Sequence, residues 1–228
     1  AYPIRSLSIP VDPRYFTMRS PFVFPLLLLI LAFGTQVIAE DDPAILTLDR
    51  IFKEKEFKTE AFSVKWRQKA DGYTFIKSAE ADGKTVGKEI WQFQPGDQEA
   101  SVMVKSSELI PFGTEEPLPI DGYAFSKDES LLLIYTNSER VWRRNTRGDY
   151  WILDRASGEL RQLGGDAPPS SLMFAKLSPT GSHVAYVRDR NINVEDLSDH
   201  SIRTLTTTNT EHIINGTSDW VYEEELGV

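Results

Sequence analysis

From residue 41 onward, short apolar or aromatic runs alternate with segments rich in turn-forming residues. The early runs are SVKWRQ, YTFIKS, IWQF and ASVMV, and the segments between them are ADG, ADGKTVGKE and QPGD. Short runs separated in this way predict β-strands joined by hairpin turns. One stretch, residues 46–57, is compatible with a helix, but it is short and highly charged. The pattern therefore predicts an all-β fold.

The strands also recur in a longer unit. Residues 123–135 lead after a gap to 149–163, and residues 174–187 lead in the same way to 192–205. Each unit reads strand, polar turn, strand, loop, strand, Asp-containing turn, strand. The serines of the first turns, Ser126 and Ser178, lie 52 residues apart, close to the roughly 40–50 residues of one β-propeller blade. A β-sandwich is the alternative, but it has no reason to repeat its turn chemistry.

The length of this region limits the number of blades. Residues 40–228 have room for about three or four four-stranded units, whereas closed propellers typically have about four to eight. We therefore expect the incomplete N-terminal part of a β-propeller, belonging to a longer protein.

A targeting segment precedes this region. Met18 and Arg19 open a short positive region, residues 22–33 are almost wholly apolar, and Val37-Ile38-Ala39 supplies small residues before a cleavage point. The apolar run is shorter than the roughly 20 residues that span a bilayer as a helix. We expect a signal peptide at residues 18–39, with residues 1–17 lying upstream or reflecting a misassigned start. The protein is then periplasmic or secreted; a membrane anchor formed by an uncleaved signal is the alternative.

Composition excludes several functions. The net charge of −9 opposes a nucleic-acid partner, because phosphate binding relies on basic patches. The absence of cysteine excludes disulfides, thiol catalysis and thiolate zinc sites. The three histidines are dispersed, at His183, His200 and His212, without metal-ligand spacing. We expect neither a metal nor a cofactor.

An acidic cluster follows two aromatic residues near the end of the sequence. Trp220 and Tyr222 lead into Glu223, Glu224 and Glu225. Carboxylates beside large apolar rings are harder to keep hydrated than those of a polar tail, which indicates a cation site. A solvated acidic face is the alternative.

Several motifs together resemble one family. HIINGTSDWVYEEELGV at residues 212–228, the blade motifs FSKDESLLLIY and LSPTGSHVAYV, and VWRRNT at residues 141–146 are similar to the dipeptidyl peptidase IV group of the prolyl oligopeptidase family of serine peptidases. The resemblance covers residues 123–228; residues 41–122 agree in character only. It implies an N-terminal propeller above a C-terminal α/β-hydrolase domain that is absent from this chain, with the active site in a cavity between the two.

The resemblance assigns roles to three residues. Glu224 and Glu225 would bind the free N-terminal ammonium of a peptide substrate, and Arg143 would reach a substrate backbone carbonyl. Two carboxylates can satisfy most of the three ammonium donors, and a guanidinium fork orients a planar acceptor. Adjacent strand residues point to opposite faces, so we expect a short helix or bulge starting near Val221. Glu223 would face elsewhere, without a binding role.

Two further expectations concern the same segment. Trp220 and Tyr222 are expected to pack and hold the turn rather than to contact substrate. The sequon that begins at Asn215 is interpreted as a turn, without modification.

The implied activity is that of an exported serine-type dipeptidyl peptidase. Anchoring the ammonium fixes how far a peptide extends before it meets the nucleophile, so that Xaa-Pro or Xaa-Ala dipeptides would be released. The nucleophile elbow G-x-S-x-G does not occur in this sequence. We therefore expect no catalytic residue in this chain and no activity from it alone. A non-catalytic periplasmic propeller that binds a partner protein remains the alternative, and a homodimer is left open.

Overall fold

The computed structural model describes residues 45–59, 63–208, 210 and 212–226. The chain divides into two compact units, Ala1–Glu60 and Ala61–Val228. The expected signal peptide and residues 1–17 lie outside the described residues. Among those that are described, no helix is long and apolar enough to cross a membrane.

The described part of the first unit contains a single helical turn, η1 (Asp49–Lys53). Arg50 holds it by donating from Nη2 to Glu56 Oε1 at 2.7 Å and from Nη1 to the Ile45 carbonyl at 2.6 Å. The same guanidinium lies 5.2 Å from the centre of the Phe57 ring. Of residues 46–57, which the sequence allowed to be helical, five form a helical turn.

The second unit begins with a four-stranded antiparallel sheet in the order β1-β2-β3-β4. Its strands are β1 (Lys65–Trp66), β2 (Tyr73–Ala81), β3 (Lys84–Phe93) and β4 (Ser101–Val104), followed by the 3₁₀ turn η2 (Ser106–Leu109). The segment ADGKTVGKE, expected to be a turn, instead continues the β2–β3 hairpin. Only Asp82 and Gly83 form the turn, both with positive φ, 53° and 73°, as a two-residue primed hairpin turn requires.

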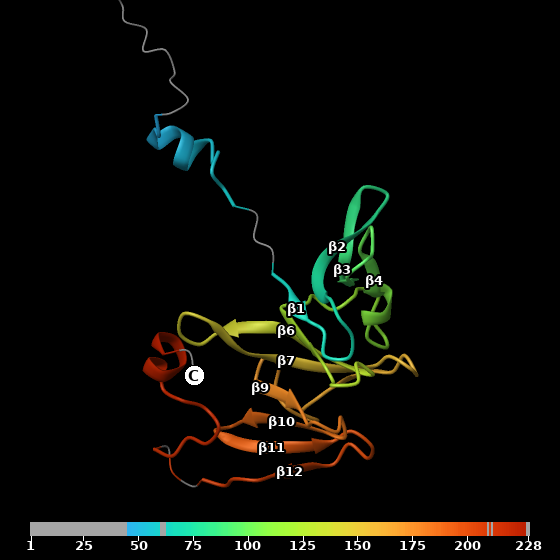
Figure 1. The fold of residues 1–228 in the computed structure, drawn as a ribbon. Helices are drawn as coiled ribbons and strands as arrows, with labels where there is room; N and C mark the ends of the chain where they lie inside the picture. Colours follow the sequence, from blue (N-terminus) through green and yellow to red (C-terminus); the bar gives the residue numbers. More distant parts are fainter. Residues whose placement is uncertain (1–44, 60–62, 209, 211, 227–228) are drawn as a thin grey trace, which may run out of the picture. The chain divides into compact units, whose positions relative to one another are not determined.

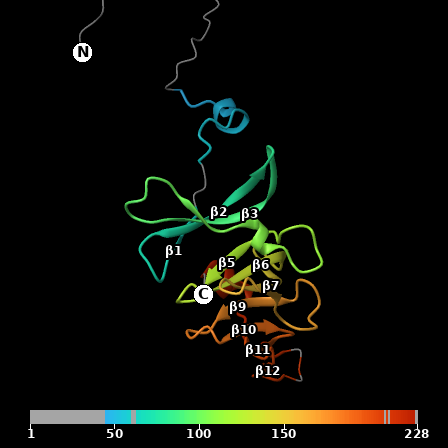
Figure 2. The same cartoon turned by 90° about the vertical axis from the view of Figure 1, so that its right-hand side faces the viewer.

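The remaining strands form a larger antiparallel sheet made of two repeated units. The first comprises β5 (Gly122–Phe125), β6 (Leu131–Arg140), β7 (Asn145–Asp154) and β8 (Leu160–Gln162); the second comprises β9 (Leu172–Leu177), β10 (His183–Arg188), β11 (Asn191–Asp196) and β12 (Ile202–Thr204). The units join where β7 pairs with β9, through Arg147 with Met173 and Gly148 with Leu172. Figures 1 and 2 show the strands of the two units following one another through the fold.

The polar turn between the first two strands of each unit is built in the same way. Ser126 N donates to the Leu131 carbonyl at 2.9 Å, and Ser178 N donates to the His183 carbonyl at 2.8 Å. Each serine hydroxyl then accepts the returning N–H, at 3.0 Å from Leu131 and 3.1 Å from His183. The repeat predicted from sequence is therefore also a repeat of hydrogen bonds.

The Asp-containing turns repeat as well. Asp154 N donates to the Glu159 carbonyl and Asp196 N to the Ser201 carbonyl, both at 2.9 Å. Each aspartate Oδ1 accepts the N–H two residues later, that of Ala156 at 2.8 Å in the first unit. An Asp side chain that closes its own turn in this way fixes the hairpin between the last two strands of each unit.

The long apolar run of β6 is explained by burial on both faces. Leu132 and Ile134 face one core cluster and Leu133 the other, and all three are at most 3% exposed. The first cluster also takes in Ile90 and Val104 of the smaller sheet. A strand covered on both sides reads as a continuous hydrophobic run rather than an alternating one.

A buried ion pair also links the smaller sheet to the larger one. Arg67 Nη2 lies 2.6 Å from Glu129 Oε2, with side chains 9% and 4% exposed. Arg67 Nε donates to the other carboxylate oxygen at 3.2 Å, so the pair is bidentate. Burial alone would raise the pKa of Glu129, but the bonds from Arg67 and the Lys69 N–H outweigh it and the pKa is lowered.

Three four-stranded antiparallel units thus follow one another along residues 65–204, with apolar clusters between them. This is the arrangement of a partial β-propeller, and it confirms the predicted fold class. The first strand of this partial propeller in the described residues begins at Lys65.

Candidate functional site

The acidic segment forms a short helical turn, η3 (Val221–Glu225). Asp219 holds its start, because Oδ1 accepts the N–H of Val221 at 2.9 Å and that of Tyr222 at 3.2 Å. The sequence predicted a short helix or a bulge starting near Val221, and the structure has the helical turn. On this turn the side chains of Glu224 and Glu225 reach the same neighbour.

That neighbour is Arg143, at the tip of the β6–β7 hairpin. The tip is closed by the Val141 N–H, which donates to the Arg144 carbonyl at 3.1 Å. Arg140 Nε braces it by donating to the Trp142 carbonyl at 2.7 Å. Figure 1 shows η3 beside this hairpin.

Glu224 is held mainly by the hairpin backbone. Its Oε1 accepts the N–H of Arg143 and, at 3.1 Å, the N–H of Arg144. Its Oε2 lies 3.5 Å from Arg143 Nε, and its side chain is 3% exposed. Two convergent N–H groups and a guanidinium are a strong anion-binding set, so this carboxylate fixes the hairpin tip against η3.

Glu225 is the accessible member of the pair. Its Oε1 accepts a hydrogen bond from Arg143 Nη1, and its side chain is 44% exposed. The Arg143 side chain is itself 63% exposed. The structure therefore brings all three predicted site residues together, with one guanidinium bound by two carboxylates, one buried and one open to solvent.

Glu223 turns inward, away from Arg143. The residue is 8% exposed, and its Oε1 is buried without a hydrogen-bond partner among the described residues. Burial raises the pKa of Glu223, the charge of Glu224 raises it further, and Arg144 opposes the shift. Glu223 was expected to face away from the other two glutamates, and its side chain does so by lying buried in the protein rather than in solvent.

The expected packing of the two aromatic residues is wrong. Trp220 is 47% exposed and Tyr222 is 53% exposed. A five-residue helical turn presents one side to its neighbours, and here Glu223 and Glu224 occupy that side. The turn is held by its own N–H groups, which donate to Asp219, and by the N–H groups of the hairpin, which donate to Glu224.

Sequence reasoning missed the backbone contribution to the site. The N–H groups of Arg143 and Arg144 are main-chain donors, and because every residue except proline has one, the sequence does not indicate which of them bind a carboxylate. The role of Asp219 was detectable, because an Asp placed two residues before a helical turn is a common acceptor for its first N–H groups.

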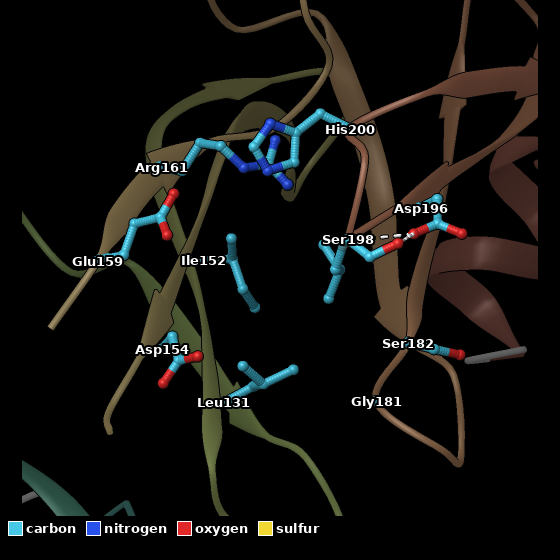
Figure 3. Close-up of a pocket in the computed structure, with 11 residues that line it drawn as sticks. Leu131, Ile152, Asp154, Glu159, Arg161, Gly181, Ser182, Asp196, Ser198 and His200 are labelled. Atoms are coloured by element: carbon cyan, nitrogen blue, oxygen red, sulfur yellow. Dashed lines mark hydrogen bonds between the residues drawn. The ribbon is translucent and has the colours of Figure 1, made fainter. Parts of the chain in front are cut away.

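A cavity of about 340 Å³ lies at the other end of the sheet. It lies between the Asp-containing turns of the two repeats, and Leu131, the first residue of β6, lines it. The hairpin that carries Arg143 follows Arg140, at the opposite end of β6. Figure 3 shows Glu159 and Arg161 on one wall and Ser198 on the other. Over the described ranges, no three His, Asp or Glu side chains are grouped as a metal would need.

Comparison with known proteins gives the relationship. Residues 126–228 match the family model of the dipeptidyl peptidase IV N-terminal region. Residues 126–228 therefore resemble a dipeptidyl peptidase IV N-terminal region. The matched residues include β6 to β8 of the first repeated unit, the whole second unit and all three site residues.

Curated relatives carry names of the same kind as this family model. Dipeptidyl aminopeptidase B of Saccharomyces cerevisiae is 34% identical over 131 residues, which are 57% of this chain and 15% of that protein. A probable dipeptidyl-aminopeptidase B of Podospora anserina is 28% identical over 190 residues, covering 79% of this chain and 20% of that protein. The chain therefore spans a fifth or less of the length of these relatives.

A solved structure agrees on the fold. The crystal structure of Porphyromonas gingivalis dipeptidyl peptidase 4 matches with a TM-score of 0.61 and 23% identity, over 80% of this chain and 25% of that chain. At this level of identity the match concerns the fold alone, and it agrees with the partial propeller described above.

Proposed function

We propose that this chain is the N-terminal, substrate-recognition part of an exported serine-type dipeptidyl peptidase that acts on peptides with a free N-terminus. One observation carries the proposal: Glu224 and Glu225, from consecutive positions on η3, converge on one cationic group, Arg143. The family match of residues 126–228 and the names of the relatives support the same function.

The chemistry of the site suits an N-terminal ammonium. An ammonium has three donors and no acceptor, and carboxylates supply charge-assisted acceptors for it. Glu225, whose carboxylate is exposed, contacts the ammonium first, and the buried carboxylate of Glu224 next to it adds negative charge. Arg143 is exposed enough to turn its fork of donors toward the first peptide carbonyl of the substrate.

Binding the ammonium and the carbonyl of the first substrate residue would fix how far a peptide extends into the active site. The distance from the bound ammonium to a nucleophile sets how many residues enter, and two residues are released as a dipeptide. Hydrolysis then belongs to the C-terminal α/β-hydrolase domain of the full-length protein, through a Ser-His-Asp triad and an oxyanion hole. The Xaa-Pro or Xaa-Ala preference is part of this proposal. So is export through residues 18–39.

Kinetics on the full-length protein test the proposal. Glu225→Gln keeps the size of the side chain but removes its charge. It should lower kcat/KM for a substrate with a free N-terminus by a factor that corresponds to about 2–5 kcal/mol of lost transition-state binding. Glu139→Gln, on the exposed part of β6, is the matched control. Unchanged kcat/KM in Glu225→Gln would contradict the ammonium site. A full-length protein that binds peptides or proteins without cleaving them would favour the non-catalytic binding module.

A further inference from the structure

Glu223 is a buried acid whose presence the site described so far does not explain. It is 8% exposed, and its Oε1 is buried with no hydrogen-bond partner in the described part of the chain. Buried carboxyl groups are normally paired, because leaving an acceptor unsatisfied is costly. This one lies on the same helical turn as the two proposed substrate-binding glutamates.

We infer that Glu223 is a specificity-determining residue of the ammonium site: from behind Glu224 it supplies the negative charge that selects a protonated N-terminus over a neutral one. The inference rests on the proposed function and adds a third acid to it. In this arrangement Glu223 touches neither the ammonium nor Arg143. It acts through the electrostatic field at Glu224 and Glu225.

The charges around η3 support this role. Arg143 is bound to Glu224 and Glu225, and Arg144 is the positive group that acts on Glu223. With Glu223 ionised, its carboxylate and those of Glu224, Glu225 and Asp219 outnumber these two guanidinium groups, so the turn is net negative and attracts a cation. The carboxylate of Asp219 accepts the first N–H groups of the turn and keeps its negative charge.

The proton on Glu223 therefore controls the attraction for a cation. Ionised Glu223 adds one negative charge to this group of charges, and its protonation removes that charge. Burial and the neighbouring Glu224 favour the protonated form, and Arg144 opposes it. An ammonium that binds at Glu225 favours the ionised form, so in mildly acidic solution binding releases the Glu223 proton to solvent.

This role predicts an effect on substrate binding rather than on the chemical step. The reacting bond lies beyond the anchored residue, and an interaction with the N-terminus that is equal in ground and transition states changes KM without changing kcat. KM of the wild type should rise on acidification as Glu223 takes up its proton, in addition to any change at the catalytic groups.

The first experiment compares full-length variants with the substrate Ala-Pro para-nitroanilide between about pH 4.5 and 8. At neutral pH, Glu223→Gln should raise KM about tenfold, the size of one charge acting over several ångströms inside a protein, with kcat within about twofold. Its KM should also lose the rise that the wild type shows on acidification. Glu159→Gln removes one exposed carboxylate from the turn after β7 and should leave both constants unchanged. A Glu223→Gln enzyme with wild-type KM at every pH would overturn the inference.

A binding measurement keeps the test independent of folding defects in the variant. Isothermal titration of the wild type with the dipeptide Ala-Pro, in two buffers of different ionisation enthalpy, reports the protons released. We expect release in mildly acidic solution from the wild type and from Glu159→Gln, and none from Glu223→Gln. Equal release from all three would assign the proton to another group and overturn the inference. A wild type that fails to cleave any substrate with a free N-terminus would instead contradict the proposed function.

Discussion

The main-chain N–H of Arg143 donates to the carboxylate of Glu224, which lies 81 residues later in the sequence. The Arg144 N–H donates to the same oxygen at 3.1 Å. The hairpin that carries Arg143 is thus positioned by an acid of the site itself. Glu224 and Glu225 therefore have different structural roles, although they are adjacent and chemically identical.

Removing the Glu224 carboxylate should loosen the hairpin tip. Glu224→Ala loses two charge-assisted bonds to backbone N–H groups, each worth about 1.5–3 kcal/mol. Amide hydrogen exchange over residues 141–146 should accelerate by at least about tenfold, because the tip opens more often. Glu225→Ala is the matched control, since Glu225 contacts only the Arg143 side chain in this hairpin. Equal acceleration in both variants would contradict the assigned division of roles.

The guanidinium of Arg143 should not be replaceable by an ammonium. Nε lies near Glu224 and Nη1 binds Glu225, so the planar group spans two carboxylates that a lysine would meet as a single point charge. In the full-length protein we expect Arg143→Lys to lower kcat/KM about tenfold and Arg143→Ala about a hundredfold, within the range for lost charged contacts.

The control for these variants is Arg147→Ala. Arg147 forms an exposed pair with Glu139 at 3.5 Å on the same hairpin, and exposed pairs contribute about 0–1 kcal/mol. Its kcat/KM should stay within about twofold of the wild type. If Arg143→Lys were as active as the wild type, the proposed fork-like contact with the substrate carbonyl would be wrong.

The sequence predicted the repeated units because their signal is local. The Ser126 and Ser178 turns and the Asp154 and Asp196 turns are closed by side chains within a few residues of each other. Residue types at short spacing therefore specify them. The overlong turn predicted before β3 was an error of the same local kind, because Lys84 and Thr85 continue a strand that polar residues obscure.

The site was less accessible to sequence reasoning. The meeting of Arg143 with Glu224 and Glu225 depends on the path of the chain over 81 residues, and only the family resemblance brought them together. The inward turn of Glu223 and the exposure of Tyr222 depend on which side of η3 contacts the hairpin. No periodicity fixes that side in a five-residue helical turn.

The Arg67–Glu129 pair should contribute to stability in a pH-dependent way. Arg67→Met leaves a buried carboxylate without its partner, at a cost of about 3–5 kcal/mol in the free energy of unfolding. Because the pKa of Glu129 is lowered in the folded state, the stabilisation is present above the pKa of an unfolded-state Glu. It is lost as the pH falls through the folded-state value.

Urea denaturation followed by tryptophan fluorescence measures this effect. The difference between wild type and Arg67→Met should be largest at neutral pH and shrink below about pH 4, as Glu129 becomes protonated in both. Arg147→Ala again serves as an exposed control. A difference that is constant down to acid pH would mean that Arg67 stabilises through packing rather than through the ion pair.

Gly148 should be required where β7 crosses from β6 to β9. A Cβ at this position would lie 2.4 Å from Tyr135 Cε2 and 2.8 Å from the Thr136 carbonyl oxygen. Tyr135 cannot easily move, since its ring stacks on Tyr150 at 4.8 Å and its hydroxyl donates to the Arg147 carbonyl at 2.7 Å. Gly148→Ala should therefore lower the free energy of unfolding by about 1–3 kcal/mol.

The matched control for Gly148 lies on the other side of the same ring. A Cβ at Gly122 would meet Tyr135 Cδ1 at 3.5 Å, an ordinary contact, so Gly122→Ala should change stability by less than about 1 kcal/mol. Because Tyr135 supports the hairpin that ends in Arg143, Gly148→Ala should also raise KM in the full-length protein, and Gly122→Ala should not. Equal destabilisation by the two substitutions would show that loss of glycine flexibility, and not the clash with Tyr135, sets the cost at Gly148.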